Sequence, residues 1–298
     1  MARILVTGTS GFIGSALAPA LVESGEIVRA ASRTPLAIAG AENVVVGDLS
    51  AKTDWRPALE GVDVVIHLAG PAHARFAEHE LKAQITDATG ALADQAEAAG
   101  VSRFIYVSSI KAAAARTYGD HALVETDTPQ PSDAYGRAKL AAENAVRKHT
   151  SLRPIILRPP LVHGPSAKAN FASLLRFADA PLPLPFAGLN NRRSVLARSS
   201  FIAAMLAVLA KPEGPSGVFH LADQPALSTG ELIQAIRAGL GRESNLFKAP
   251  WLAALGPDVL TESLAVDDRA FRAAYDHTPS ASAADLITET ARAWKARA

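Results

Sequence analysis

Residues 3–14 read R-I-L-V-T-G-T-S-G-F-I-G, a short apolar run followed by Gly8, Gly11 and Gly14. The run predicts a buried strand, and the apolar residues that follow predict a helix. Glycines at this spacing permit a tight turn, close approach of the backbone to a ligand, and close packing of helix on strand. Because a helix N-terminus attracts anions, the turn predicts a dinucleotide-binding site. We expect cofactor contacts from Gly8, Ser10, Gly11, Phe12, Ile13 and Gly14.

Up to Arg158, short apolar runs alternate with longer helical patterns, which is typical of a parallel sheet covered by helices. The expected fold class is α/β, a Rossmann-like doubly wound parallel sheet. The expected strands are Arg3–Thr7, Ile27–Ala31, Asn43–Val46, Val62–Leu68, Arg103–Ser108 and Ile155–Arg158. The expected helices are Phe12–Ser24, Ala77–Ala99 and Tyr135–His149.

After Arg158 the pattern is interrupted by closely spaced prolines, among them Pro181, Pro183 and Pro185. This change predicts a smaller, interleaved C-terminal substrate lobe. We expect a dinucleotide-binding domain over 1–165, completed by returning segments near 190–225, and a substrate lobe over 166–298. Further expected elements are helices Ala169–Ala178, Ser200–Leu209 and Thr229–Gly239, and a strand Val218–Leu221.

Composition narrows the class of protein. The 298 residues carry a formal net charge of +1, which gives no general attraction for nucleic acid or an anionic membrane. The chain has no cysteine, and its histidine spacing supports no metal site. Its N-terminus enters a strand pattern at once, and its longest apolar stretch, Phe201 to Ala210, is half the length of a membrane span. We therefore expect a cytoplasmic protein.

The end of the second strand bears on cofactor choice. NAD-binding proteins usually have an acidic residue there, which holds the ribose 2′-hydroxyl. This chain has Ser32 and Arg33 instead, and a hydroxyl and a guanidinium suit a 2′-phosphate. The pattern favours NADP(H), while NAD(H) stays open because Arg33 could equally be a solvated loop residue.

Tyr135 and Lys139 stand four residues apart on one predicted helix face. A nearby ammonium lowers the high pKa of a phenol, which suits acid–base work. Ser108 and Ser109 end a buried strand, and strand ends in such a sheet face the cofactor crevice. The three elements together predict a catalytic group.

The glycine turn, the strand-end serine and Tyr-x-x-x-Lys, in this order, resemble the extended short-chain dehydrogenase/reductases, which are NAD(P)-dependent nucleotide-sugar epimerases, dehydratases and reductases. Further motifs of this resemblance are Gly47-Asp48-Leu49, Ile66-His67-Leu68-Ala69-Gly70 and Arg158 to Pro165. The resemblance covers nearly the whole chain.

The resemblance implies roles for single residues. Tyr135 is the general acid/base, Lys139 lowers its pKa and binds the nicotinamide ribose, and Ser109 hydrogen-bonds the reacting oxygen. The implied cofactor contacts are Asp48 and Leu49 near the adenine, then Leu68, Ala69, Gly70, Tyr135, Lys139 and Pro159. The implied substrate contacts are Ser109, Lys111, Asn170 and Arg193, although Asn170 also suits a helix cap and Arg193 a surface charge.

Three positions depart from the family pattern. Ile85 stands where the family often has asparagine, and His163 precedes Gly164-Pro165 where tyrosine is usual. Arg198-Ser199-Ser200 replaces a common acidic residue. The first departure bears on the proton relay, and the other two bear on substrate choice or packing.

The resemblance is to enzymes that act on UDP-hexoses or UDP-N-acetylhexosamines as 4-epimerases or 4-keto reductases. Because Ser32 and Arg33 favour NADPH, we expect a reductase of a 4-keto nucleotide sugar. The alternatives are a UDP-sugar 4-epimerase with tightly bound NAD, a reductase of non-nucleotide aldehydes or ketones, and a non-catalytic NADP-binding sensor. The intact Ser109, Tyr135 and Lys139 argue against the sensor.

The resemblance also predicts a homodimer, because in relatives the helices near Ala77–Ala99 and Tyr135–His149 form a four-helix interface. Both segments are rich in alanine, and small side chains permit close helix approach. We expect light scattering to give twice the chain's 31.1 kDa at micromolar concentration. A monomer mass would mean that the alanines reflect helix propensity alone.

Overall fold

The computed structural model describes residues 1–71, 76–166 and 169–297, and it divides into two compact units. Unit 1 comprises Met1–Ala115, Glu125–Arg158 and Leu206–Phe219. Unit 2 comprises Arg116–Val124, Pro159–Met205 and His220–Ala298. Each unit takes segments from distant parts of the chain. Residues 159–165, which were expected in the first domain, group with unit 2 because the strand over 161–163 pairs with one over 193–197 there.

Unit 1 is built on a seven-stranded sheet in the order β10-β6-β5-β4-β1-β2-β3. In the part of the sheet that runs from β6 through β5, β4, β1 and β2 to β3, each strand pairs in parallel with the next. The order reverses between β1 and β4, as in the Rossmann fold, and confirms the predicted doubly wound sheet. The strands are β1 (Arg3–Thr7), β2 (Ile27–Ser32), β3 (Glu42–Val45), β4 (Val64–His67), β5 (Arg103–Val107), β6 (Ile155–Arg158) and β10 (Gly217–His220).

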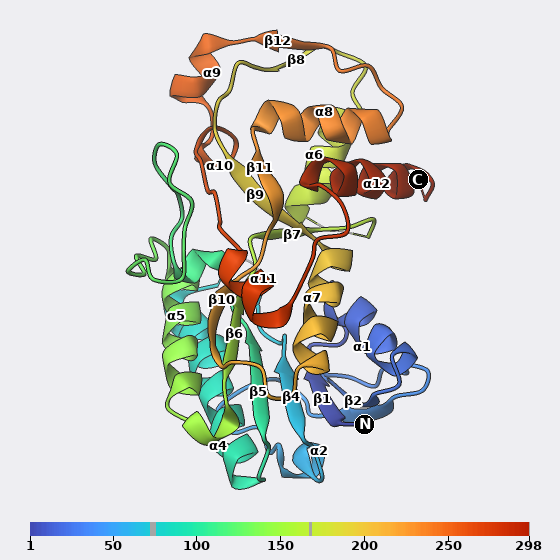
Figure 1. Ribbon diagram of the computed structural model, residues 1–298, viewed down its shortest axis with the longest axis vertical. Coiled ribbons are helices and arrows are strands. Elements are labelled where there is room, and N and C mark those ends of the chain that lie inside the picture. Colours follow the sequence, from blue (N-terminus) through green and yellow to red (C-terminus); the bar gives the residue numbers. More distant parts are fainter. Residues whose placement is uncertain (72–75, 167–168, 298) are drawn as a thin grey trace. The chain divides into compact units, whose positions relative to one another are not determined.

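The central strands are apolar because both faces of the sheet are covered. In Figure 1, α4 and α5 lie side by side along β4, β5 and β6, while α1 lies beside β1 and β2. The edge strand β3 is the exception, with Val45 54% exposed. The helical segments of unit 1 before β6 are α1 (Gly14–Glu23), α2 (Arg56–Leu59), α3 (Glu78–Leu81), η1 (Lys82–Asp87), α4 (Ala88–Ala98), η2 (Ile110–Ala112), α5 (Ala134–Arg147) and η3 (Thr150–Leu152).

The helix expected over Ala77–Ala99 is not one continuous α-helix. A π-helical turn, η1, separates α3 from α4. Within it Ile85 is buried, and the Thr86 hydroxyl donates to the Ala138 carbonyl of α5 at 3.0 Å. The π-turn therefore coincides with the contact between this helix and α5.

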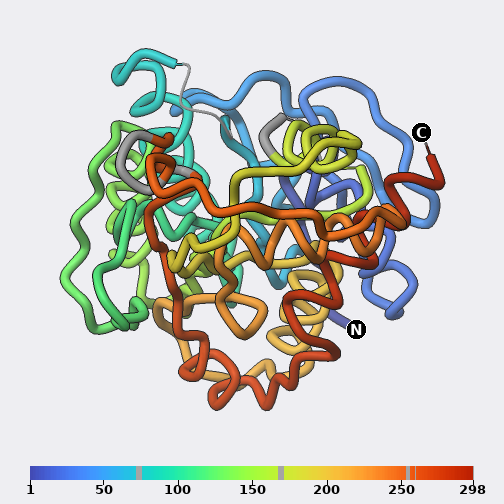
Figure 2. Tube along the Cα trace, turned by 90° about the horizontal axis from the view of Figure 1, so that it is seen from above, coloured from blue at the N-terminus to red at the C-terminus, as the bar shows by residue number. Residues whose placement is uncertain are grey.

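Unit 2 contains two small sheets, β11-β9-β7 and β12-β8. The pairing of β8 with β12 brings chain segments about sixty residues apart side by side, yellow and orange in Figure 2. The elements that begin in unit 2 are β7 (Leu161–His163), α6 (Ala169–Ala178), β8 (Leu184–Ala187), β9 (Arg193–Ala197), α7 (Arg198–Ala210), β11 (Asp223–Leu227), α8 (Thr229–Gly239), β12 (Leu246–Lys248), α9 (Pro250–Leu255), α10 (Asp258–Thr261), α11 (Arg269–Tyr275) and α12 (Ala283–Lys295).

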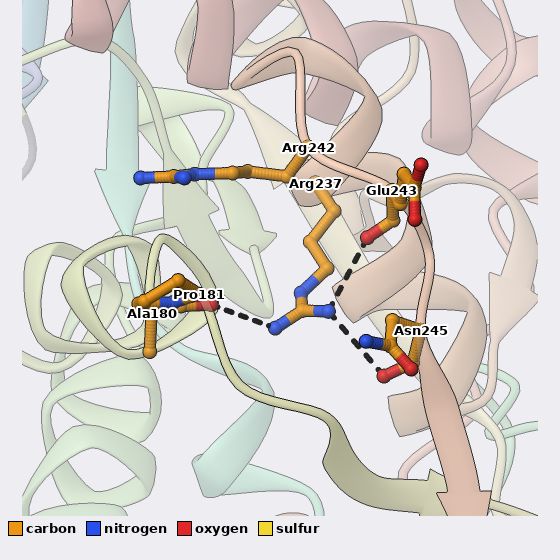
Figure 3. Close-up of a pocket in the computed structure, with 6 residues that line it drawn as sticks. All are labelled: Ala180, Pro181, Arg237, Arg242, Glu243 and Asn245. Carbon is orange, nitrogen blue, oxygen red and sulfur yellow. Dashed lines mark hydrogen bonds between the residues drawn. The ribbon is translucent and has the colours of Figure 1, made fainter.

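Arg237 of α8 anchors the segments that lead into β8 and β12. Its buried guanidinium donates to the carbonyls of Ala180 and Leu182 at 3.0 and 2.6 Å on one side. On the other side it donates to the carbonyls of Glu243 and Asn245 at 3.2 and 3.3 Å (Figure 3). Because an arginine has five N–H donors, one side chain satisfies carbonyls from two loops at once.

No helix among the described residues combines the length and the apolar character that crossing a bilayer requires.

The start of α5 is packed tightly against the segment that follows β5. Asp133 caps the helix by accepting a hydrogen bond from the Gly136 N–H at 2.7 Å. A Cβ on Gly136 would lie 2.3 Å from the Lys111 carbonyl oxygen. Glycine at this position therefore lets α5 approach the strand end that carries Ser109.

We expect Gly136→Ala to destabilise the protein by about 1–3 kcal/mol, because the added methyl must displace backbone. Gly90→Ala in α4 is the matched control, since a Cβ there would lie 3.6 Å from the Ala145 Cβ, an ordinary contact. That control should gain about 0.5–1 kcal/mol from helix propensity. Thermal unfolding measures both, and equal effects of the two substitutions would contradict the close approach at Gly136.

Candidate active site

The glycine turn between β1 and α1 forms an open cradle. Gly8 has a φ of +74°, and a Cβ there would lie 2.8 Å from the Ala69 nitrogen. A Cβ on Gly14 would lie 2.2 Å from the Gly8 carbonyl oxygen, whereas one on Gly11 would meet only that oxygen, at 3.1 Å. Within the described residues no side chain caps the start of α1. The exposed Gly11 backbone and uncapped N-terminus fit the pyrophosphate of a dinucleotide.

Ser10, Phe12 and Ile13 lie in the same turn, with Ser10 exposed and the other two half-buried. Across from them, the turn after β4 holds Leu68, Ala69 and Gly70. The Ala69 N–H donates to the Thr7 hydroxyl at 3.2 Å, which ties this turn to the end of β1. The predicted residues of both turns therefore lie together at the carboxyl edge of the sheet.

A buried histidine supports this edge. The two ring nitrogens of His67 hydrogen-bond the hydroxyls of Thr7 and Thr89 at 2.7 and 3.0 Å. Burial, together with the Lys139 ammonium, lowers the pKa of His67 to about 3. The imidazole is therefore neutral at physiological pH, and it links β4 to β1 and α4.

The residues expected at the adenine end are also neighbours. Arg33 and Asp48 form a loose ion pair at 3.5 Å, with side chains 74% and 86% exposed, so the pair contributes little to stability. Leu49 is half-buried against the apolar core. The Ser32 hydroxyl is buried and donates to the Thr34 carbonyl at 2.7 Å. Its hydrogen is thus committed to the chain's own backbone.

The structure brings Ser109 and Tyr135 together. Ser109 follows β5 and Tyr135 lies in the first turn of α5, and the two side chains lie close enough for the Ser109 hydroxyl to lower the pKa of Tyr135. Both residues are half-buried, so the pair remains accessible from the carboxyl edge of the sheet. This arrangement matches the predicted catalytic group.

Lys139 lies one turn further along α5 and is buried. Its ammonium donates to the Val107 carbonyl at 3.0 Å and lies 4.9 Å from the ring centroid of Tyr106 and 5.9 Å from that of Tyr135. Burial lowers the pKa of Lys139 to about 8, although the Glu143 carboxylate opposes this change.

The pKa of Tyr135 is not lowered below its ordinary value in this structure. Burial raises the pKa of Tyr135 to about 12, and the Asp133 carboxylate adds to the rise, against the hydrogen bond from Ser109. The phenol is therefore fully protonated at neutral pH.

Lys111, expected to contact substrate, forms an ion pair with Asp133 at 2.7 Å. Although burial raises the pKa of Asp133, hydrogen bonds from Lys111 and the Gly136 N–H bring it below its usual range. Sequence reasoning missed Asp133. Its signal was present, because an aspartate directly before a helix that starts at Ala134 is a common N-cap.

The remaining predicted residues lie in unit 2. Pro159 is buried just after β6. Asn170 is in the first turn of α6, and its side chain lies outside the described residues. Arg193 begins β9 and donates to the Glu262 carbonyl at 2.9 Å, and burial lowers the pKa of its guanidinium. It is thus a half-buried, anchored cation rather than a solvated charge.

The departures from the family pattern also have packing partners. Ile85 lies 3.9 Å from the position that a Cβ on Gly70 would take. His163 is buried, stacks on Phe171 at 5.1 Å and hydrogen-bonds the Thr290 hydroxyl at 3.0 Å. The Arg198 guanidinium donates to the Ser166 hydroxyl at 3.0 Å.

Two surface hollows lie apart from the predicted residues. One, of about 160 Å³, surrounds Arg237 in unit 2 (Figure 3). The other, of about 460 Å³ in unit 1, is lined by residues 125–129 with Arg147, Arg158 and Val218. In the described part of the chain, no group of three or more metal-ligating side chains occurs. The strand-end cluster is thus the candidate site.

Comparisons with known proteins agree with this geometry. Residues 4–222 match the model of the NAD dependent epimerase/dehydratase family. A UDP-glucose 4-epimerase of Vibrio cholerae is 33% identical over 249 residues, covering 80% of this chain and 76% of that protein. A ceramide reductase of Caulobacter vibrioides (strain NA1000 / CB15N) is 28% identical over 271 residues, covering 89% and 77%.

The fold is also that of solved structures. The crystal structure of UDP-N-acetylglucosamine 4-epimerase from Bacillus cereus superposes with a TM-score of 0.81 at 22% identity, covering 99% of this chain and 100% of that one. The family match spans the glycine turn, Ser109, Tyr135 and Lys139. This chain is therefore an enzyme of the NAD dependent epimerase/dehydratase family, an extended short-chain dehydrogenase/reductase.

Proposed function

We propose that the protein is an NADPH-dependent reductase of a 4-keto nucleotide sugar of the UDP-hexose class. The observation that carries the proposal is the placement of Ser109 after β5 and of Tyr135 in the first turn of α5, beside the buried Lys139. A phenol whose pKa is about 12 is a proton donor at neutral pH. Reduction of a ketone needs such a donor.

In the proposed reaction a bound nicotinamide supplies a hydride, and this chain's side chains manage the proton and the charge. Tyr135 gives its phenolic proton to the ketone oxygen as negative charge develops there. Ser109 donates a hydrogen bond to the same oxygen and stabilises that charge. Lys139 binds the nicotinamide ribose and lies close enough to the Tyr135 ring to favour the phenolate left by the transfer.

The cofactor would be held along the carboxyl edge of unit 1. The turn Gly8–Gly14 would hold the pyrophosphate, Asp48 and Leu49 the adenine, and Arg33 the 2′-phosphate. The turn Leu68–Gly70 and Pro159 would lie along the nicotinamide half. A phosphate on Arg33 would replace a weak, exposed ion pair with a bidentate charge-assisted contact.

The substrate would be held by Lys111, Asn170 and Arg193. Arg193 supports a diphosphate contact because its position is fixed by the Glu262 carbonyl while its guanidinium keeps its charge. Lys111 would have to exchange Asp133 for the substrate, which makes it the weaker of the two cationic candidates.

A UDP-sugar 4-epimerase with tightly held NAD is the second candidate. The similarity to the Vibrio cholerae epimerase favours it. An epimerase must first remove a proton from the sugar hydroxyl, so Tyr135 would have to act as a base. Burial keeps the phenol protonated, which is the form in which a reduction begins. Reduction of a non-nucleotide carbonyl is a further alternative, because the chain is also similar to the ceramide reductase of Caulobacter vibrioides.

We expect the protein to bind NADPH more tightly than NADH, and Arg33→Ala to weaken NADPH binding while sparing NADH. Loss of one charge-assisted contact should cost about tenfold in affinity. Fluorescence titration with each nucleotide measures both effects. Arg56→Ala, at an exposed arginine paired with Asp54, is the matched control and should change neither affinity. Equal affinities of the wild type for both nucleotides, or NAD that co-purifies tightly, would favour the epimerase instead.

Tyr135→Phe removes the transferable proton and should lower turnover by about 10²-fold or more. It should leave NADPH affinity unchanged, because the pyrophosphate is held at Gly8–Gly14. Lys139→Met should weaken both turnover and cofactor binding, since it also loses the ribose contact. A UDP-4-keto-hexose with NADPH is the assay, and NADPH absorbance is the readout. Tyr118→Phe, at a tyrosine 73% exposed, is the control. Near-normal turnover in Tyr135→Phe would overturn the mechanism.

A further inference from the structure

A buried carboxylate lies beyond Lys139 on the same face of α5. Glu143 is 1% exposed and receives two hydrogen bonds from Arg158, from Nε to Oε1 at 2.9 Å and from Nη2 to Oε2 at 2.6 Å. The Ser108 hydroxyl donates to Oε1 at 2.5 Å. The Glu143 carboxylate of α5 thus binds Arg158 of β6 and Ser108, the residue that follows β5.

This junction is adjacent to every part of the proposed catalytic group. Ser108 directly precedes Ser109, and Arg158 is the last residue of β6. Glu143 follows Lys139 by one helical turn and Tyr135 by two, so the three side chains project from the same stripe of α5. A change in the length or charge of Glu143 is therefore transmitted to Ser109 through β5 and to Lys139 through α5.

Stability alone does not account for this ion pair. Burying two charges is costly, and apolar replacements of a buried pair are often neutral or stabilising. Arg158 and Glu143 nevertheless occupy positions that are 3% and 1% exposed. A requirement for a fixed charge or a fixed geometry at this place accounts for the buried pair better than a contribution to folding does.

The protonation of the Lys139 ammonium depends on the charges of the groups around it. The groups that face it are Glu143 and Tyr135 on α5, Tyr106 on β5 and His67 on β4. Burial raises the pKa of Tyr106 well above its ordinary value and lowers that of His67 to about 3, so both are neutral. Glu143 is the neighbour that counters the burial of the ammonium.

We propose that Glu143 is a positioning residue for the reaction: held by Arg158 and Ser108, it keeps α5 in register with the ends of β5 and β6 and keeps Lys139 charged. This inference rests on the roles proposed above for Tyr135 and Lys139. Glu143 itself touches neither the cofactor nor the reacting oxygen in this assignment. It acts through Lys139.

The test compares two full-length variants by NMR titration of the Lys139 side chain, assigned with Lys139→Met. Glu143→Gln/Arg158→Gln removes both buried charges together, so no unpaired ion is left in the core. The Lys139 pKa should fall by about one unit or more. At pH 8 the protonated fraction of Lys139 would then drop about fivefold. The pH above which turnover declines should fall by the same amount as the Lys139 pKa.

Glu143→Asp keeps the charge and shortens the side chain, so the Lys139 pKa should stay close to that of the wild type while kcat falls and KM is unchanged. It also provides a readout if the double variant does not fold. Arg153→Gln/Glu213→Gln removes an exposed ion pair of unit 1 and is the matched control, expected to change nothing.

An unchanged Lys139 pKa in the folded double variant would overturn the inference, as would an equal fall in Glu143→Asp. Failure of the proposed function gives a different result. The wild type would then reduce no keto nucleotide sugar, while its Lys139 titration would still respond to removal of the Glu143 charge.

Discussion

The close approach of α1 to the end of β1 is the constraint on which the rest of unit 1 depends. A Cβ on Gly14 would lie 2.2 Å from the Gly8 carbonyl oxygen, so any larger residue would push the helix away from the turn. Gly8 in turn lies against the backbone of Ala69, at the end of the strand on the other side of the switch point. Two glycines thus let α1 and the turn after β4 come close to the end of β1, at the switch point where a dinucleotide would bind.

Much of this was predictable because the strands of unit 1 are short, apolar and buried on both faces. β1, β5 and β6 carry continuous apolar runs, and their expected bounds agree with the structure to within one residue. The small sheets of unit 2 gave no such signal. β8 reads L-P-F-A and β11 reads D-Q-P-A-L, and each becomes a strand only through a partner about thirty or more residues away in the chain.

In the candidate site, too, the contacts between residues far apart in the chain could not be predicted from the sequence. The spacing of Tyr135 and Lys139 could be read from the chain, and so could the strand-end position of Ser109. The protonation states of these side chains could not be predicted from the sequence, because they depend on which groups are buried next to one another. Asp133 and Glu143 read as ordinary helix carboxylates, yet one ties Lys111 to the start of α5 and the other binds Arg158 and Ser108 in the core. The commitment of the Ser32 hydroxyl to Thr34 was equally invisible.

Burial and nearby carboxylates together set the protonation states along one stripe of α5. Burial favours the neutral forms of both Tyr135 and Lys139, raising the pKa of the first and lowering that of the second. The Asp133 carboxylate reinforces the protonated phenol, whereas Glu143 preserves the ammonium. The helix thus presents a proton donor at its first turn and a cation behind it. In the proposed reduction, the cation one turn away would stabilise the phenolate that remains after the donor has lost its proton.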